Sequence, residues 1–194
     1  MGCYLYRFPI SDVVFDLLSA VANVNFRPVE AQTLPLLFSS LPDAPPARHA
    51  IPERIKILNV LSALETLCTQ AQLFETLVIR LTTKLDLICV PSISLLTQSS
   101  ATEAELHAAY AHWILTTLAK VLQKKVDRED PDVPKYIERL VPGIFNLFVF
   151  SAFAVAEDDD NGRKRERVSV ATDPRLVKKA GEIVSLVIQA LPSG

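Results

Sequence analysis

The chain has 194 residues, 49% of them hydrophobic, so it is long and apolar enough to build a folded core rather than remain disordered. Its 20 basic and 22 acidic side chains leave a net charge of −2, which argues against nucleic-acid binding driven by overall neutralisation of phosphate charge. The five glycines lie too far apart to form a phosphate-binding loop, which excludes P-loop and dinucleotide-binding proteins.

Apolar residues recur at intervals of three and four along most of the chain, which predicts amphipathic helices. The clearest case is the stripe that begins at Leu73 and ends at Ile88. Strand signals are nearly absent, since the best one, Val168–Val170, is too short to found a sheet. The predicted helices lie, in chain order, near residues 11–24, 30–41, 53–70, 73–89, 103–126, 133–153 and 173–191.

Several of these helices begin at polar residues with the spacing of helix caps. Thr69–Gln72 and Thr102–Glu105 match the capping box, in which the first and fourth side chains bind free amide groups of the first turn. Asp130–Pro134 and Asp173–Pro174 combine a capping aspartate with a proline that the first helical turn tolerates. The short connection at Thr69–Gln72 makes its two helices fold back on each other as a hairpin.

The helical pairs recur at a regular spacing. Their first helices begin near residues 6, 53, 103 and 173, and paired helices every ~40–47 residues are typical of HEAT and armadillo proteins. We therefore predict an all-α, HEAT/armadillo-like α-solenoid of antiparallel helical pairs, with residues 1–194 as a single array. Residues 90–101 are expected to form a loop, and residues 155–172 a charged loop insertion. An ordinary helical bundle is the alternative.

Two of the second helices share an internal similarity. Residues 34–41 align with residues 141–148, so that Pro35 and Pro142 both stand early in a helix. A proline inside a helix removes a backbone hydrogen bond and bends the helix. We expect both prolines to lie in helices, where they help to curve the array.

The sequence offers no recognisable catalytic, cofactor-binding or metal-binding residues. His107 and His112 are five residues apart, roughly 140° around a helix, so they cannot bind one metal ion together, and His49 stands in a proline-rich loop. No nucleophile elbow or catalytic triad spacing is present. We predict that the chain is not an enzyme and has no cofactor, although a site assembled from distant residues of a helical enzyme stays an alternative.

The cysteines and two segments of unusual charge bear on the compartment and the class of the protein. Three widely spaced cysteines form no disulfide framework, which favours a reducing compartment. Residues 140–156 carry no formal charge, at the short end for a membrane span, so a membrane protein is another alternative. Glu157–Arg167 is an acidic run followed by a basic one, typical of a solvated loop or of a nuclear import signal.

The C-terminal helix is apolar on several sides. Its charged residues stop early, whereas apolar ones continue to the end: Val184, Leu186, Val187, Ile188 and Leu191. Because repeat arrays need polar capping repeats at their ends, we expect this helix to expose an uncapped apolar surface and the chain to self-associate.

Four segments carry a family resemblance. Thr33–Asp43, Leu73–Cys89, Val133–Pro142 and Ala171–Arg175 resemble an internal stretch of the large HEAT-repeat scaffold family named for methyl-methanesulfonate sensitivity. The similarity covers most of residues 30–190. Because this chain is much shorter than that family's proteins, it resembles an internal fragment of them.

The resemblance implies a protein–protein adaptor. The family belongs to the cytosolic iron–sulfur assembly targeting complex and holds the late assembly machinery against recipient apoproteins of DNA repair and transcription. By this resemblance we expect the targeting subunits and the recipient apoproteins as partners, in the cytoplasm and the nucleus, without direct binding to nucleic acid or membrane. Another HEAT/armadillo scaffold, such as a transport receptor or a phosphatase subunit, is the alternative.

Overall fold

The computed structural model describes residues 9–89, 101–150 and 170–191, and every regular element in these ranges is helical. The α-helices are α1 (Pro9–Val24), α2 (Leu34–Ser39), α3 (Ile51–Leu67), α4 (Ala71–Cys89), α5 (Ala101–Asp127), α6 (Tyr136–Arg139), α7 (Val141–Ile144) and α9 (Pro174–Gln189). Shorter segments are the π-helical η1 (Val29–Thr33) and η3 (Phe145–Phe150) and the 3-10 turns η2 (Val133–Lys135) and η4 (Val170–Thr172). The predicted all-α class is confirmed.

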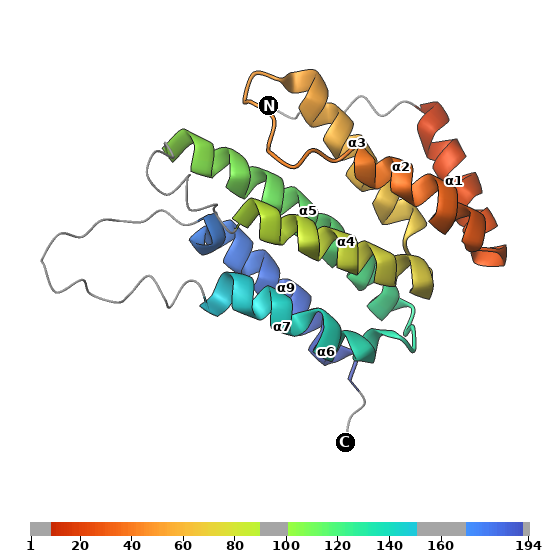
Figure 1. Cartoon of the computed structure of the whole chain (residues 1–194). Helices are drawn as coiled ribbons and strands as arrows, with labels where there is room; N and C mark the ends of the chain where they lie inside the picture. Colours follow the sequence, from red (N-terminus) through yellow and green to blue (C-terminus); the bar gives the residue numbers. More distant parts are fainter. Residues whose placement is uncertain (1–8, 90–100, 151–169, 192–194) are drawn as a thin grey trace, which may run out of the picture.

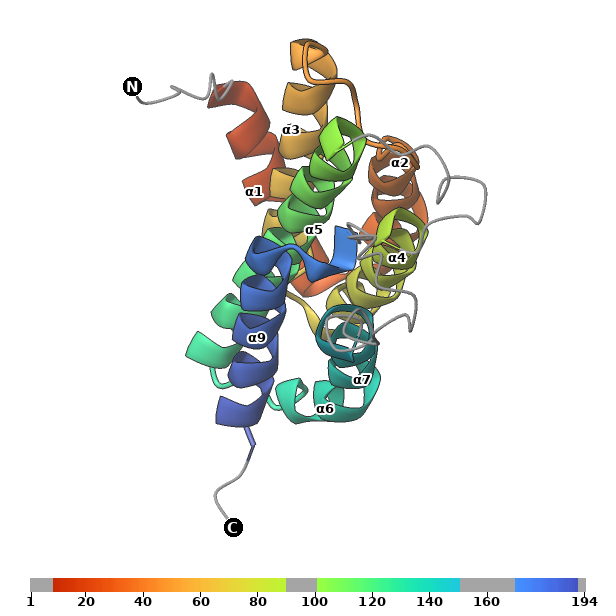
Figure 2. The ribbon, with the colours of Figure 1, turned by 90° about the vertical axis from the view of Figure 1, so that its left-hand side faces the viewer.

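The helices alternate between two layers (Figures 1 and 2). Seen from the side in Figure 2, α1, α3, α5 and α9 form one layer, here called layer A, and α2, α4, α6 and α7 form the other, layer B. The long helices α3, α4 and α5 run in alternating directions, as antiparallel pairs require (Figure 1). α5 lies at the centre, where it contacts α3 and α4 and packs most extensively against α9.

The core lies between the two layers and follows the predicted apolar stripes. In α4 every residue of the expected stripe is buried, from Leu73 and Phe74 to Ile88. In α5 the fully buried side chains include Tyr110, whose hydroxyl donates to the carbonyl oxygen of Pro42 at 2.9 Å. This bond ties the centre of layer A to the loop that follows α2.

A buried lysine joins three segments of the chain. Lys125, near the end of α5, is only 1% exposed. Its Nζ donates to Asp130 Oδ2 at 2.7 Å and to the carbonyl oxygen of Thr69 at 3.1 Å, and lies 2.9 Å from Asp132 Oδ1. It also lies 5.6 Å from the centre of the Phe74 ring. One cation thus holds the α3–α4 turn and the segment after α5 against α5.

Some helix starts differ from the predicted caps. At α4 the amide of Gln72 donates to Gln70 Oε1 at 3.0 Å, so the neighbouring glutamine caps the helix in place of Thr69. At α5 the Glu105 carboxylate binds Arg175 of α9, at 2.9 and 3.1 Å, which takes it from the expected capping role. At α5 a contact with another helix has therefore displaced the local cap, whereas at α4 an adjacent residue provides it. The cap at α9 is confirmed.

The Asp173 cap of α9 has the expected geometry. Its Oδ1 accepts from the backbone amide of Arg175 at 2.8 Å, and its Oδ2 accepts from the guanidinium at 2.7 Å. Pro174 occupies the first turn. The Arg175 hydrogen bonds hold the pKa of Asp173 below its usual value, although partial burial opposes this.

The long helix expected at 133–153 is divided. A 3-10 turn, two short α-helices and a π-helical segment follow one another, with a break at Leu140 (φ −109°) just before Pro142. Pro142 has no N–H to donate to the preceding turn, which accounts for the break. Pro35 occupies the first turn of α2, directly after the π-helical η1. Both prolines lie in helical segments of layer B, as predicted.

The expected exposure of the C-terminal helix is wrong in the main. Leu186 is 9% exposed, Val187 is fully buried and Val184 is half-buried, because α9 packs between α5 and the layer-B segments α6, α7 and η3. Large apolar exposure is confined to Ile188 and Leu191 at its end.

The predicted loops lie almost wholly outside the described residues. Of the segment 90–101, the structure describes Ala101, which begins α5; of the segment 155–172, it describes η4. Residues 151–156 of the uncharged run 140–156 also lie outside. No helix in the described part of the chain is both long and apolar enough to cross a membrane.

Candidate interaction surfaces

The histidines and cysteines occupy separate structural positions. His107 Nδ1 lies 2.9 Å from the carbonyl oxygen of Glu103, one turn back in α5. Burial lowers the pKa of His112, and the positive charges of Lys179 and Arg175 lower it further. Within residues 9–89, 101–150 and 170–191, no three His, Cys, Asp or Glu side chains are grouped so that they could hold a metal ion.

The two cysteines of the described ranges are shielded. Cys68 and Cys89 are both buried and are free thiols. Burial raises the pKa of each thiol to about 12, and for Cys89 the nearby Asp86 adds to the effect. Because the thiolate is the reactive form, neither side chain is suited to nucleophilic chemistry.

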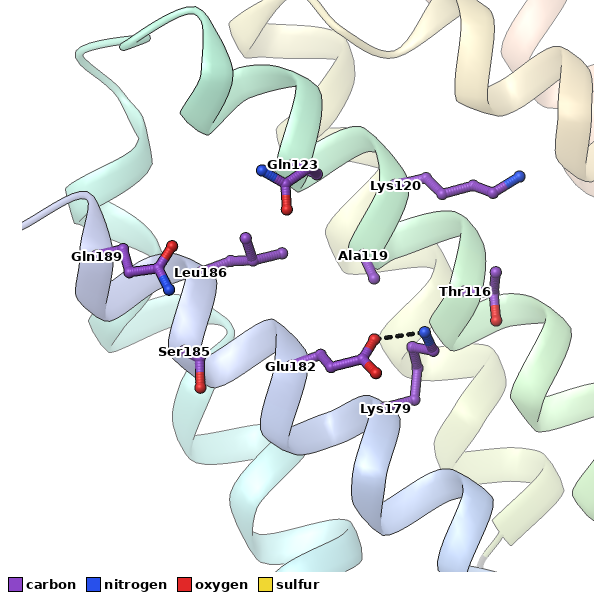
Figure 3. A pocket seen from close by; sticks show the side chains of 9 residues that line it. All are labelled: Thr116, Ala119, Lys120, Gln123, Lys179, Glu182, Ser185, Leu186 and Gln189. Carbon is purple, nitrogen blue, oxygen red and sulfur yellow. Dashed lines mark hydrogen bonds and ion pairs between the residues drawn. The ribbon is translucent and has the colours of Figure 1, made fainter.

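A groove of about 530 Å³ runs between α5 and α9 in layer A (Figure 3). The apolar side chains of Ala119 and Leu186 lie along it. Its remaining lining is polar: Thr116, Lys120, Gln123, Lys179, Glu182, Ser185 and Gln189. The charged members are paired, Lys179 with Glu182 and Lys120 with Glu65, at 3.2 Å for the latter pair. The groove therefore presents a balanced polar surface without a reactive group.

A second groove, of about 370 Å³, lies between α4 and α6 in layer B. At its edge, Glu75 binds Lys135 at 3.1 Å and also Arg139. The hydrogen bond from Lys135 is the main reason why the pKa of Glu75 is lowered. Tyr136 lines this groove and is fully buried, and its hydroxyl has no hydrogen-bond partner in the structure described here.

Layer B exposes large apolar side chains along its length. They are Leu36 of α2 (70% exposed), Ile79 (58%) and Leu87 (63%) of α4, and Phe145 of η3 (45%), and we call these four residues the layer-B patch. Layer A also exposes large apolar side chains, on α1, on α3 and at the end of α9, but its central helix α5 shows none among its described residues. Exposed apolar groups set among polar ones are typical of protein-binding surfaces.

The sequence reasoning did not identify this patch. Ile79 and Leu87 are apolar, but they fall outside the stripe that α4 buries, and this mismatch is the signal that would have found them. Leu36 follows Pro35 directly, and Phe145 stands three residues after Pro142.

One family model matches most of the described helices. The family model of the MMS19 C-terminal region, described as RNAPII transcription regulator C-terminal, matches residues 60–194. Searches of curated proteins and of solved structures give no significant match. The matched residues take in α4, α5, α9 and most of the buried core. Since the match covers more than half of the chain, the protein belongs to the MMS19 family of transcription regulators, through that family's C-terminal region.

Proposed function

We propose that this chain is a protein-binding scaffold of the cytosolic iron–sulfur assembly targeting complex. In this role it holds the targeting subunits against recipient apoproteins of DNA repair and transcription, in the cytoplasm and the nucleus. The family's regulatory description supports a scaffold in transcription and DNA repair. The resemblance of residues 30–190 to the iron–sulfur targeting scaffold supports the specific partners.

The layer-B patch is the observation that carries this proposal. Its residues come from α2, α4 and η3, so a partner that lies across layer B would contact several helical segments at once. Binding energy in interfaces is concentrated in a few buried apolar and aromatic anchors, which Ile79, Leu87 and Phe145 can supply. The mechanism is geometric, because the packed core holds these side chains at fixed separations and no group has to react.

Copurification from cell extract tests the proposal. The tagged chain is compared with an Ile79→Asp/Leu87→Asp variant and with a matched layer-A variant, Ile51→Asp/Ile55→Asp, which also changes two exposed apolar side chains of one helix. We expect mass spectrometry to recover iron–sulfur targeting subunits with the unaltered chain and the layer-A variant, and to lose them with the layer-B variant.

Two results would contradict the proposal. Nuclear transport factors or phosphatase subunits in place of targeting subunits would assign the chain to another class of scaffold. Equal recovery with both variants would show that layer B is not the binding surface.

A further inference from the structure

The second groove, between α4 and α6, has an unused hydrogen-bond donor in its lining. Tyr136 is fully buried, yet it lines this groove, and its hydroxyl has no hydrogen-bond partner among the described residues. Burial raises the pKa of Tyr136, so the hydroxyl keeps its hydrogen and can donate it. An unpartnered buried donor costs stability, and a ligand that accepts its hydrogen bond would recover that cost.

The edge of this groove carries a net positive charge. Glu75 binds two cations there, Lys135 through Oε2 and Arg139 through Oε1. Both oxygens of the carboxylate are therefore used, whereas the Arg139 guanidinium uses only Nη1 among the described residues, and its side chain is 53% exposed. Because two positive charges face one negative charge, a further carboxylate is attracted to the free side of Arg139.

The apolar wall of the groove belongs to the layer-B patch. Val78 and Ile79 of α4 line it, and Ile79 is 58% exposed. An apolar surface, a hydroxyl donor and a cation thus border one volume of about 370 Å³. Ligand pockets measure about 300–1,000 Å³, so this groove is of a size for one or two side chains rather than for a folded domain.

We propose that this groove binds an acidic residue of a partner protein, whose carboxylate accepts hydrogen bonds from Tyr136 and Arg139 while a neighbouring apolar residue packs on Ile79. A carboxylate has two oxygens, so it can accept both bonds, and bonds to an ionised group are stronger than neutral ones. The inference rests on the proposed function, because Ile79 belongs to both surfaces. It adds the chemistry that this surface selects, which is an acidic and apolar segment rather than an apolar one alone.

Fluorescence anisotropy with two labelled peptides tests this selectivity. The probes are a short blocked peptide of alternating leucine and glutamate and the same peptide with glutamine in place of glutamate. We expect the unaltered chain to bind the glutamate peptide at least about tenfold more tightly than the glutamine peptide. Tyr136→Phe and Arg139→Gln should each reduce this preference at least about threefold. The control is Arg80→Gln, which removes the same charge from an exposed arginine of α4 outside the groove lining and should leave the preference unchanged.

Four results would overturn the inference. They are equal affinity for the two peptides, no binding of the glutamate peptide at about 1 mM, an unchanged preference in Tyr136→Phe, and complete displacement of the peptide by inorganic phosphate at the same concentration, which would show a general anion site. Urea unfolding of Tyr136→Phe is a further check. If this substitution destabilises the chain, the hydroxyl already has a partner within the fold, such as the unpartnered Oδ2 of Asp132, and the assignment is wrong.

The two proposals fail in different ways. Targeting subunits that bind the chain while the peptide preference is absent would refute the acidic selectivity alone. A peptide preference that depends on Tyr136, without any binding of the targeting subunits, would refute the identity of the partners and leave the groove as a site for acidic segments.

Discussion

Replacing Lys125 with Met removes the cation that joins three segments while it keeps most of the apolar stem. Asp130 and Asp132 would then face each other without their lysine, with side chains that are 26% and 16% exposed. Breaking a buried ion pair on one side costs about 3–5 kcal/mol. Because both aspartate side chains remain partly exposed to solvent, we expect a cost at the lower end of this range, about 3 kcal/mol. For a chain of this size that lowers Tm by about 6–12 °C.

The assay is urea unfolding followed by circular dichroism, with Lys120→Met as the control. Lys120 lies on the same helix and binds Glu65 at 3.2 Å, but its side chain is 58% exposed, so its loss should cost about 1 kcal/mol or less. Adding Asp132→Asn to Lys125→Met should restore part of the lost stability, because it removes one unpaired carboxylate. If Lys125→Met were no more destabilising than Lys120→Met, the reasoning about the buried cation would be refuted.

Three further predictions concern single side chains. Tyr110→Phe should lower the free energy of unfolding by about 1 kcal/mol because it deletes a buried hydrogen bond, whereas Tyr136→Phe should be neutral or stabilising because that hydroxyl has no partner in the described structure; urea unfolding compares them. Asp173→Ala should cost about 1 kcal/mol at neutral pH through the lost cap, and the difference from the unaltered chain should shrink in acid. The pKa of Asp173 is held below 3.8, so its stabilisation is present above that value and lost as pH falls through the folded-state pKa, which unfolding at several pH values would show. Cys68 and Cys89 should react with a thiol reagent only on unfolding, and rapid labelling of the native chain would contradict their burial.

The helices and their buried faces could be predicted because they depend on local periodicity. The stripe from Leu73 to Ile88 is buried as a whole, and the aspartate cap at Asp173 has the expected geometry. The capping boxes could not be predicted in the same way, since Glu105 meets Arg175 from a helix 70 residues away. A charged side chain that pairs with a residue distant in the sequence is no longer available to cap its own helix.

Which apolar side chains are exposed depends on which helices pack side by side, and a single sequence does not show that packing. Most of α9 is covered on two sides, by α5 and by the segments around α7, so the largest apolar exposure of layer A stands on α1 instead, as at Leu17 and Val24. The burial of Lys125 has the same origin, because its two aspartates come from the turn that follows α5. Periodicity alone assigns a lysine near a helix end to solvent.

Direct binding between the purified chain and purified iron–sulfur targeting subunits tests the central claim. Calorimetry at fixed salt concentration would compare the unaltered chain with Ile79→Asp/Leu87→Asp and Ile51→Asp/Ile55→Asp. We predict saturable binding that the layer-B substitutions weaken at least about tenfold, a loss of about 1.4 kcal/mol, and that the layer-A substitutions leave unchanged. The absence of binding, or equal affinity for all three chains, would contradict the account.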